Sequence, residues 1–334
     1  MRDGPLDVVG IGNAIVDVLV RVDDRWLVEH GLKKGTMTLI DDDRAEKLAV
    51  SIGKGVECSG GSAANTMAGL ASFGGRGAYM GKVRRDRLGA VFASDIRSVG
   101  VEYATPAAAS GPATGRCLVL VTPDAQRTMQ TYLGASGTFG PADLDPDVIH
   151  RARITYLEGY LWDPPEAKRA FLRACRIAHE AGRRVALTLS DPFCVDRHRD
   201  DLLALIREHV DIVFANRDEL LALFETAAFD EAFSSLRAVC PTAVVTCGAE
   251  GSIAADARGV STIAAVTLSG VVDTTGAGDL YAAGFLFGLA RELPLARCGE
   301  LGSLAAAEII GHLGARPEVR LAELAASRGL ARGG

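Results

Sequence analysis

Short apolar runs alternate with longer helix-like stretches over most of the chain. Residues 8–12, 185–189, 211–215 and 243–246 are short, mainly apolar runs, a length and composition that favour buried strands. Strands that alternate with helices form a mostly parallel sheet covered by helices on both faces. The pattern therefore predicts a doubly wound α/β domain, whose ligands bind beyond the carboxyl ends of the strands.

Two segments far apart in the sequence have a different pattern of apolar and polar residues. Residues 18–22 and 35–40 are short β-like runs separated by polar turns, and residues 117–121 and 128–133 flank the turn-like stretch 122–126, which is a hairpin pattern. No low-complexity linker divides the chain. We therefore predict one large domain with a small β-sheet lid. The predicted ranges are 5–17, 49–112 and 136–330 for the large domain, and 18–48 and 113–135 for the lid.

Composition narrows the classes of function. Of 334 residues, 48% are hydrophobic and 23% charged, as in ordinary globular proteins. The net charge of -6 and the dispersed Lys and Arg argue against nucleic-acid binding. No apolar stretch reaches the roughly 18 residues of a membrane span. The first residues lack an apolar signal core, so we expect a cytoplasmic location. The seven cysteines and six histidines show no metal-type spacing.

The strongest chemical pattern is the segment 273–279, Asp-Thr-Thr-Gly-Ala-Gly-Asp, followed by the apolar stretch 280–290. A stretch that is apolar all round predicts a buried helix. Gly276, Ala277 and Gly278 allow the backbone to turn its N–H groups toward one point, where the helix end adds positive potential. The segment therefore predicts a phosphate cradle.

Asp279 closes this segment. A carboxylate beside a phosphate is unfavourable unless it has a task, and the evident task is to accept the proton of an attacking hydroxyl. The alternative is a residue that only caps the helix. Other nucleotide-binding patterns fit less well, since residues 10–15 lack the third glycine of a dinucleotide fingerprint and the chain has no Walker loop.

The segment 273–279 resembles the C-terminal signature of the ribokinase-like family, also called PfkB carbohydrate kinases. Residues 59–65, continuing to 73–75 and 81–83, resemble its N-terminal signature, so the resemblance covers nearly the whole chain. It implies a ribokinase-like three-layer αβα domain with a small β-sheet lid. It also implies an ATP-dependent phosphotransferase that acts on an alcohol group.

The resemblance places the acceptor near the first signature. Gly60 and Gly61 would let a substrate approach the backbone, and the Asn65 amide would bind vicinal hydroxyls together with Asp17. For Asp17 a capping role, and for the glycines a tight turn, are the alternatives. Asn13 belongs to the same implied substrate site.

The resemblance assigns the donor site to other segments. Asn216 and Glu219 match an Asn-x-x-Glu motif associated with magnesium and phosphate, and they would orient the water shell of Mg²⁺. Arg127 would stabilise the transferring phosphate, although an exposed β-strand arginine is the alternative. The sequence leaves open whether K⁺ is also used. The residues implied for ATP are Asn216, Thr246, Gly248, Gly251, Thr274 and Ala306.

Within the family, residues 12–17, 114–117 and 188–193 resemble adenosine kinases most. This implies conversion of adenosine to AMP, a reaction of purine salvage. Tyr160 or Trp162 would stack on the base, although either could belong to the core. A kinase for ribose, fructose or a similar sugar and a silent nucleoside-binding protein are the alternatives. Both a monomer and a homodimer formed through the lid stay open.

Asp191 departs from the adenosine kinase pattern. Those kinases often have a small residue at this place after Leu-Ser, whereas this chain has a carboxylate. It could serve magnesium or select a different base or sugar, so its role stays open.

Overall fold

The main sheet of the protein carries strands from most of the chain. The computed structural model describes residues 4–124, 126–267 and 270–330. Among them a nine-stranded sheet has the order β14-β13-β12-β11-β10-β9-β1-β5-β6. Neighbours are parallel from β12 to β6, and β13 and β14 add an antiparallel edge. The strands are β1 (Leu6–Ile11), β5 (Gly77–Met80), β6 (Glu102–Tyr103), β9 (Ala152–Glu158), β10 (Arg184–Thr188), β11 (Ile212–Asn216), β12 (Thr242–Thr246), β13 (Ser252–Asp256) and β14 (Gly259–Ile263).

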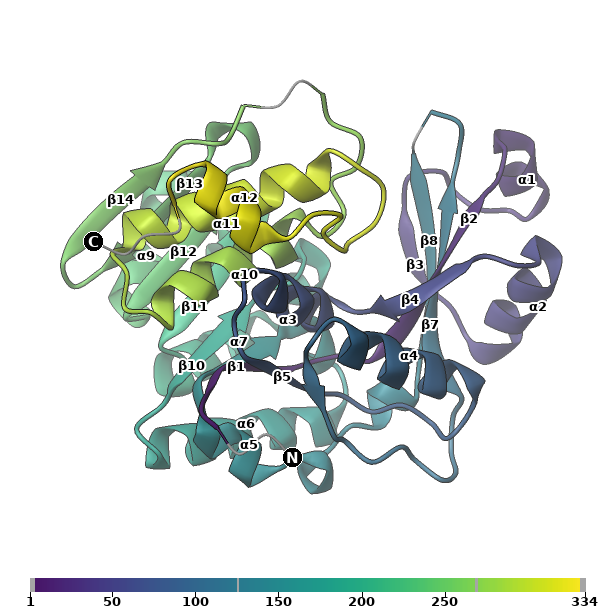
Figure 1. Cartoon of the computed structure of the whole chain (residues 1–334), viewed down its shortest axis with the longest axis horizontal. Coiled ribbons are helices and arrows are strands. Elements are labelled where there is room, and N and C mark those ends of the chain that lie inside the picture. The colour runs from purple at the N-terminus through teal and green to yellow at the C-terminus, as the bar shows by residue number, and fades with distance from the viewer. Residues whose placement is uncertain (1–3, 125, 268–269, 331–334) are drawn as a thin grey trace.

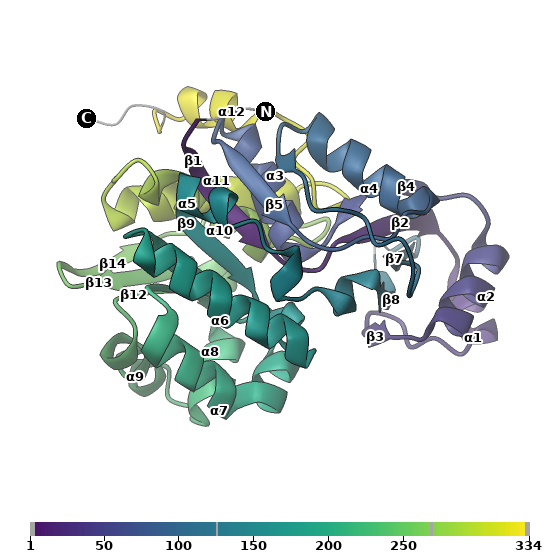
Figure 2. The same cartoon turned by 90° about the horizontal axis from the view of Figure 1, so that it is seen from below.

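Helices cover both faces of this sheet, as Figures 1 and 2 show. Alternate residues of a strand pack into different cores: Val8 and Val244 belong to one buried cluster, Val9 and Val245 to the other. The first cluster lies under α3 (Ser62–Ser72), α4 (Arg87–Ser98), α10 (Ala277–Leu289) and α11 (Leu295–Ile310), with α12 (Leu321–Ser327) outside them. The second lies under α5 (Pro146–Arg151), α6 (Pro165–Glu180), α7 (Pro192–His209), α8 (Arg217–Phe224) and α9 (Phe229–Val239). The predicted three-layer αβα architecture is confirmed.

A second, five-stranded sheet stands beside the large domain, at the right of Figure 1. Its order is β3-β8-β7-β2-β4, and helices α1 and α2 flank it. The predicted hairpin is formed by β7 and β8, and its turn includes residue 125, which lies outside the described residues. The bounds are β2 (Ile15–Arg21), α1 (Asp24–Glu29), β3 (Met37–Leu39), α2 (Asp42–Ile52), β4 (Val56–Gly60), β7 (Thr114–Val121) and β8 (Arg127–Gly134).

The boundaries of this small sheet differ from the predicted ones. Residues 15–17 and 56–60 were assigned to the large domain, but β2 and β4 pair with each other, from Ile15 with Gly60 to Leu19 with Val56. Asp17 therefore lies inside a strand of the small sheet. The apolar pattern does not reveal this, because it cannot show to which sheet a strand is added.

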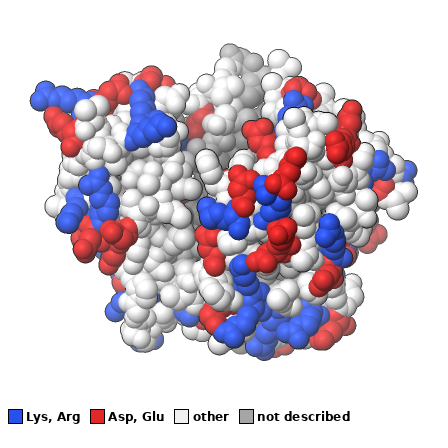
Figure 3. Space-filling view, turned by 180° about the vertical axis from the view of Figure 1, so that it is seen from behind, with Lys and Arg blue, Asp and Glu red and all other residues white. Residues whose placement is uncertain are grey.

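Charged side chains of both signs are interspersed on the surface (Figure 3). On the face shown in Figure 3, most Lys and Arg side chains lie next to Asp and Glu, and a broad area between these groups carries no charge. Over the described part of the chain, none of the helices combines the length and the apolar character that a membrane crossing needs.

Candidate active site

A cavity of about 740 Å³ lies between the two sheets. The last residues of four neighbouring parallel strands line it, namely Glu158, Thr188, Asn216 and Thr246. The carboxyl ends of parallel strands meet at one edge, which is where ligands of doubly wound sheets bind. The small sheet supplies a largely apolar wall: Ile15, Met37, Leu39, Cys117, Met129 and Leu133.

The segment 273–279 forms a tight turn at the start of α10. Gly276 has a φ of 79°, in the left-handed region, and a Cβ there would lie 2.9 Å from the Cβ of Ala315. The turn is closed by the N–H of Ala277, which donates to the carbonyl of Thr274 at 3.2 Å. That N–H is bonded within the turn in this structure, and its contact with a phosphate stays a prediction. Gly278 is exposed and has open space around its α-carbon.

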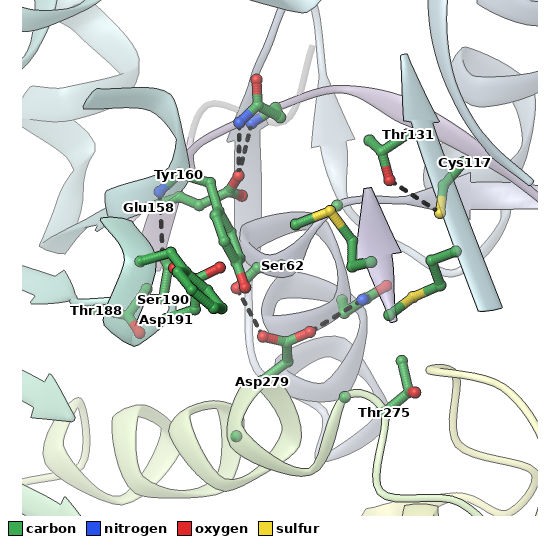
Figure 4. A pocket seen from close by; sticks show the side chains of 18 of the residues that line it. Ser62, Cys117, Thr131, Glu158, Tyr160, Thr188, Ser190, Asp191, Thr275 and Asp279 are labelled. Atoms are coloured by element: carbon green, nitrogen blue, oxygen red, sulfur yellow. Dashed lines mark hydrogen bonds between the residues drawn. The ribbon is translucent and has the colours of Figure 1, made fainter. Parts of the chain in front are cut away.

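Asp279, in the first turn of α10, faces the start of α3. Its Oδ1 accepts a hydrogen bond from Ser62 Oγ at 2.6 Å, and its Oδ2 accepts one from Asn65 Nδ2 at 3.0 Å (Figure 4). Burial raises the pKa of Asp279, and the two hydrogen bonds oppose that rise. The predicted alternative, in which Asp279 only caps the helix, does not account for these contacts.

The contacts of Asn65 differ in part from the prediction. Its amide nitrogen is engaged with Asp279, whereas its buried Oδ1 has no hydrogen-bond partner among the described residues. A buried acceptor without a partner is costly unless a ligand supplies a donor. Asn65 can thus accept from a hydroxyl in the cavity. Ser62 was not singled out, although it lies in the predicted motif.

Asp17 points from β2 toward the same place. Burial raises its pKa to about 6, the positive charges of Arg316 and Arg127 oppose this, and Asp279 adds to it. A Cβ on Gly60 would overlap the Asp17 carboxylate, and one on Gly61, with a φ of 99°, would overlap the Asn13 carbonyl oxygen. The two glycines therefore make room for protein atoms. Gly61 also lines the cavity, so the approach of a substrate to this backbone stays a prediction.

Glu158 is a buried carboxylate that the sequence analysis missed. It accepts from Asn13 N at 3.2 Å, from Asn13 Nδ2 at 2.9 Å and from Ala63 N at 2.8 Å. Asn13 Oδ1 accepts from Ser136 Oγ at 3.0 Å, so the Asn13 amide is held by protein on both sides. Burial raises the pKa of Glu158 to about 7. The sequence feature that could have identified Glu158 is a carboxylate placed directly at the end of an apolar strand.

Tyr160 and Trp162 lie in a 3₁₀ turn, Gly159–Trp162, and face different surroundings. With about three residues per turn, side chains two positions apart cannot share a face. Tyr160 lines the cavity. Trp162 is 4% exposed and packs on Phe171 in the core, with the ring centroids 5.7 Å apart. The prediction is therefore wrong for Trp162 as a cavity residue.

Asp191 lines the cavity and has a structural partner. It is the N-cap of α7, where its carboxylate accepts from the N–H of Cys194 at 2.6 Å. In Figure 4 Asp191, Glu158 and Tyr160 lie on one side of Asp279, while Cys117 and Thr131 of the small sheet lie on the other. A wall with the polar groups of Asp191, Glu158 and Tyr160 therefore faces the largely apolar wall of the small sheet across the base of the cavity.

A second cavity, of about 540 Å³, adjoins the first. Five residues predicted to bind ATP line it: Thr246, Gly248, Gly251, Thr274 and Ala306. Thr246, Gly278 and Tyr281 line both cavities. The two spaces therefore meet at the N-terminus of α10, next to Asp279.

Asn216 and Glu219 are bonded to each other at the start of α8. Glu219 accepts from Asn216 N at 2.9 Å and from Asn216 Nδ2 at 2.7 Å, while Asn216 Oδ1 accepts from Glu219 N at 2.8 Å. Burial raises the pKa of Glu219 to about 7. Both residues line the larger cavity. Within the described ranges, no three His, Cys, Asp or Glu side chains are grouped to hold a metal ion.

Arg127 is neither exposed nor in contact with the cavity. It is buried, and its Nη2 lies 2.5 Å from Oδ2 of Asp273, which is also buried. The ion pair links β8 of the small sheet to the turn before α10. The contact with the transferring phosphate stays a prediction, while the alternative of an exposed arginine is wrong.

The comparisons with known proteins agree on one family. Residues 33–320 match the model of the pfkB family carbohydrate kinases. Adenosine kinase of Saccharomyces cerevisiae is 28% identical over 329 residues, covering 92% of this chain and 95% of that protein. The crystal structure of adenosine kinase from Sinorhizobium meliloti is 52% identical with a TM-score of 0.91, covering 97% and 100%. A probable sugar kinase protein from Rhizobium etli CFN 42 is 48% identical with a TM-score of 0.92, covering 98% and 99%.

Proposed function

Because the chain belongs to the pfkB family of carbohydrate kinases, we propose that it transfers a phosphoryl group from ATP to a primary hydroxyl of adenosine. The predicted family and fold are confirmed by the same comparisons. The observation that carries the proposal is the junction of two cavities at Gly278, with the Asp279 carboxylate beside it. A donor in one cavity and an acceptor in the other would meet at a base.

Asp279 is the proposed base. Its carboxylate takes the proton of the acceptor hydroxyl as the oxygen attacks the phosphorus. Ser62 and Asn65 fix the orientation of this carboxylate from two sides. The Asp17 carboxylate and the free Oδ1 of Asn65 are acceptors for ribose hydroxyls. Acceptors that converge on a diol suit a ribose with its two hydroxyls free.

The base of the nucleoside has a proposed place between the small sheet and Tyr160. The wall of the small sheet is apolar and includes two thioethers, Met37 and Met129, and a purine ring gains from such contacts. Tyr160 faces it from the large domain and can stack on the ring. This wall favours a nucleoside over a free sugar, which would leave it without a contact.

The residues of the donor side fit ATP with Mg²⁺. The N-terminus of α10 offers unpaired N–H groups to phosphate oxygens at the exposed Gly278. The described residues form no carboxylate cage, and Asn216 and Glu219 would hold the water shell of the ion. Mg²⁺, when bound, supplies positive charge that neutralises the phosphates. Arg127 is proposed to add to this charge after it leaves Asp273.

A sugar kinase is the second candidate, because the chain is also similar to the probable sugar kinase protein from Rhizobium etli. The test compares ADP release from ATP and magnesium with adenosine, guanosine, inosine, ribose, fructose and fructose 6-phosphate at equal concentrations. We expect adenosine to be preferred at least about tenfold, which corresponds to about 1.4 kcal/mol. The Asp279→Asn enzyme gives the background. If ribose or fructose were preferred, the acceptor would be a sugar and not adenosine.

Substitutions at Tyr160 and Trp162 should separate a binding role from a core role. Tyr160→Ala should raise KM for adenosine by about tenfold because a stacked ring is lost. Trp162→Phe should leave that KM within about twofold and lower stability by about 1–2 kcal/mol, because a smaller ring leaves a void beside Phe171. Kinetics and urea unfolding of both variants measure the two effects. A large KM change for Trp162→Phe would contradict its assignment to the core.

A further inference from the structure

The short segment after α11 connects the two elements that meet at Asp279. The N–H of Gly314 donates to Asp273 Oδ2 at 3.3 Å, and Ala315 packs against Gly276, where a side chain would not fit. The next residue, Arg316, reaches to the other element. The segment therefore contacts the turn before α10 on one side and the start of α3 on the other.

The Arg316 guanidinium bridges the end of β4 and the first turn of α3. Its Nε and Nη2 donate to the Ser59 carbonyl at 3.2 and 2.6 Å, Nη2 also donates to Ser59 Oγ at 2.8 Å, and Nη1 donates to the Ala64 carbonyl at 2.9 Å. Ser59 is held in turn by Asp95, which accepts from its N at 2.8 Å and its Oγ at 2.6 Å. The four intervening residues, 60–63, are thus clamped from both ends.

Residues 60–62 and Asn65 contact the other residues of the site. Gly60 and Gly61 lie against Asp17 and Asn13, Ser62 donates to Asp279, and Asn65 follows directly after Ala64. A planar guanidinium with a fixed fork of donors can hold two carbonyls at a set separation. Movement of either carbonyl would displace the donors that orient Asp279.

We propose that Arg316 is a positioning residue for phosphoryl transfer, which fixes the turn that presents Ser62 and Asn65 to Asp279 and supplies positive charge near Asp17 and Asp279. This inference rests on the proposed role of Asp279 as the base. Arg316 does not touch the substrate in this assignment, and it acts through the residues that it holds.

The positive charge of Arg316 affects the ionisation of the carboxylates in the site. Its hydrogen bonds in the described structure go to carbonyl and hydroxyl oxygens, so the charge is not neutralised by a carboxylate in contact with it. Burial lowers the pKa of Arg316, and the negative charges of Asp17, Asp95 and Asp279 oppose this. In return, Arg316 lowers the pKa of Asp17 and of Asp279 against the effect of burial.

Other groups around Asp279 mostly act in the opposite direction. Asp17 of β2, Glu158 of β9 and Glu219 of α8 are acidic neighbours whose pKa values Asp279 helps to raise. Tyr156 of β9 and Tyr160 are weakly acidic neighbours of the same carboxylate. Ser62 and Asn65 of α3 are neutral donors. Loss of the Arg316 charge therefore leaves Asp279 in an acidic environment.

The test compares Arg316→Gln and Arg316→Lys with Arg320→Gln as the control, because Arg320 is on the same segment and its side chain is 74% exposed. The measurements are kcat and the pH profile of kcat/KM, with the acceptor that the wild-type enzyme prefers, and Tm for each variant. Arg316→Gln should lower kcat by about tenfold to a hundredfold and move the acid limb upward by about one pH unit. Arg320→Gln should change neither.

Arg316→Lys separates the charge from the clamp. It keeps the charge, so the acid limb should stay near its wild-type position, while kcat should fall because one ammonium cannot hold both carbonyls. If Arg316→Gln does not fold, this variant carries the test: an acid limb displaced by a unit with unchanged kcat would overturn the proposal. An unmoved acid limb in a folded Arg316→Gln enzyme would overturn it as well. A wild-type enzyme without turnover on any acceptor would instead refute the proposed function.

Discussion

Asp279→Asn should reduce kcat by about a hundredfold to ten-thousandfold, the range expected when a general base is removed. An amide of the same size cannot accept the proton of the acceptor hydroxyl. One oxygen can still accept from Ser62, which donates to Asp279 at 2.6 Å. KM for ATP should stay within about twofold because the turn at Gly276 is unchanged. Single-turnover measurements with saturating ATP give the chemical step directly.

Ser62→Ala is the matched control for this substitution. It removes one of the two hydrogen bonds to the carboxylate and leaves the base itself in place. We expect a loss of about tenfold or less in kcat, together with a higher acid limb, because the lost bond had favoured the ionised form of Asp279. If Asp279→Asn were as active as Ser62→Ala, Asp279 would not be the base.

Asp17→Asn should lower kcat/KM for the acceptor by about a hundredfold and, unlike most active-site losses, should raise Tm at pH 8 by about 2–5 °C. Burial raises the folded pKa of Asp17 to about 6, above its usual value. The folded state then binds this proton more tightly than the unfolded state, so stability falls as pH rises from about 4 to about 6. Above that window the ionised carboxylate of Asp17 destabilises the folded state by the full amount, and the neutral amide of the Asn variant avoids this loss.

Measurements of Tm between pH 4 and pH 8 test the sign of this effect. The gain of Asp17→Asn should be present at pH 8 and should shrink toward pH 4; it is lost only below the ordinary aspartate pKa of about 4, where the carboxyl is protonated in both states. Asp124→Asn, in the turn between β7 and β8, is the control. Its carboxylate is bonded to Lys34 and has a pKa lowered to about 2, so its replacement should give no gain in Tm and no loss of kcat/KM. A lower Tm for Asp17→Asn at pH 8 would show that its charge is well compensated.

The fold could be predicted because its signals are local. Apolar runs such as 243–246 became strands of the main sheet, and the apolar stretch after Asp279 became the buried helix α10. The sheet to which a strand belongs is not a local property. The strand Val56–Gly60 pairs with Ile15–Arg21, and neither segment carries a signal for its partner. This is why the boundary of the small sheet was placed incorrectly.

Site residues that belong to a sequence motif could be predicted. Site residues that are brought in only by tertiary contacts could not. The motif placed Asp279 and Gly276 correctly beside the cavity. Ser62 reaches Asp279 across 217 positions of sequence, and Arg316 reaches Ser59 across 257. The first contact follows from the packing of α3 on α10 and the second from the course of the segment after α11, and no pattern of residue types indicates either. For Trp162 the sequence left a core role open beside the binding role, since an aromatic residue suits a core and a binding site equally well.

The interleaved origin of the small sheet has a consequence for how the chain folds. Ile15 pairs with Gly115 and Met37 with Met129, so only the β7–β8 hairpin joins strands that are close in sequence. Closing such long loops is entropically expensive, and non-local pairings form slowly. The hairpin joins strands that are neighbours in sequence, whereas β2 pairs with β7 from a distant part of the chain, and β1, which directly precedes β2, pairs with β5 and β9 of the main sheet. The wall that faces the acceptor therefore depends on non-local pairings, the kind that forms slowly.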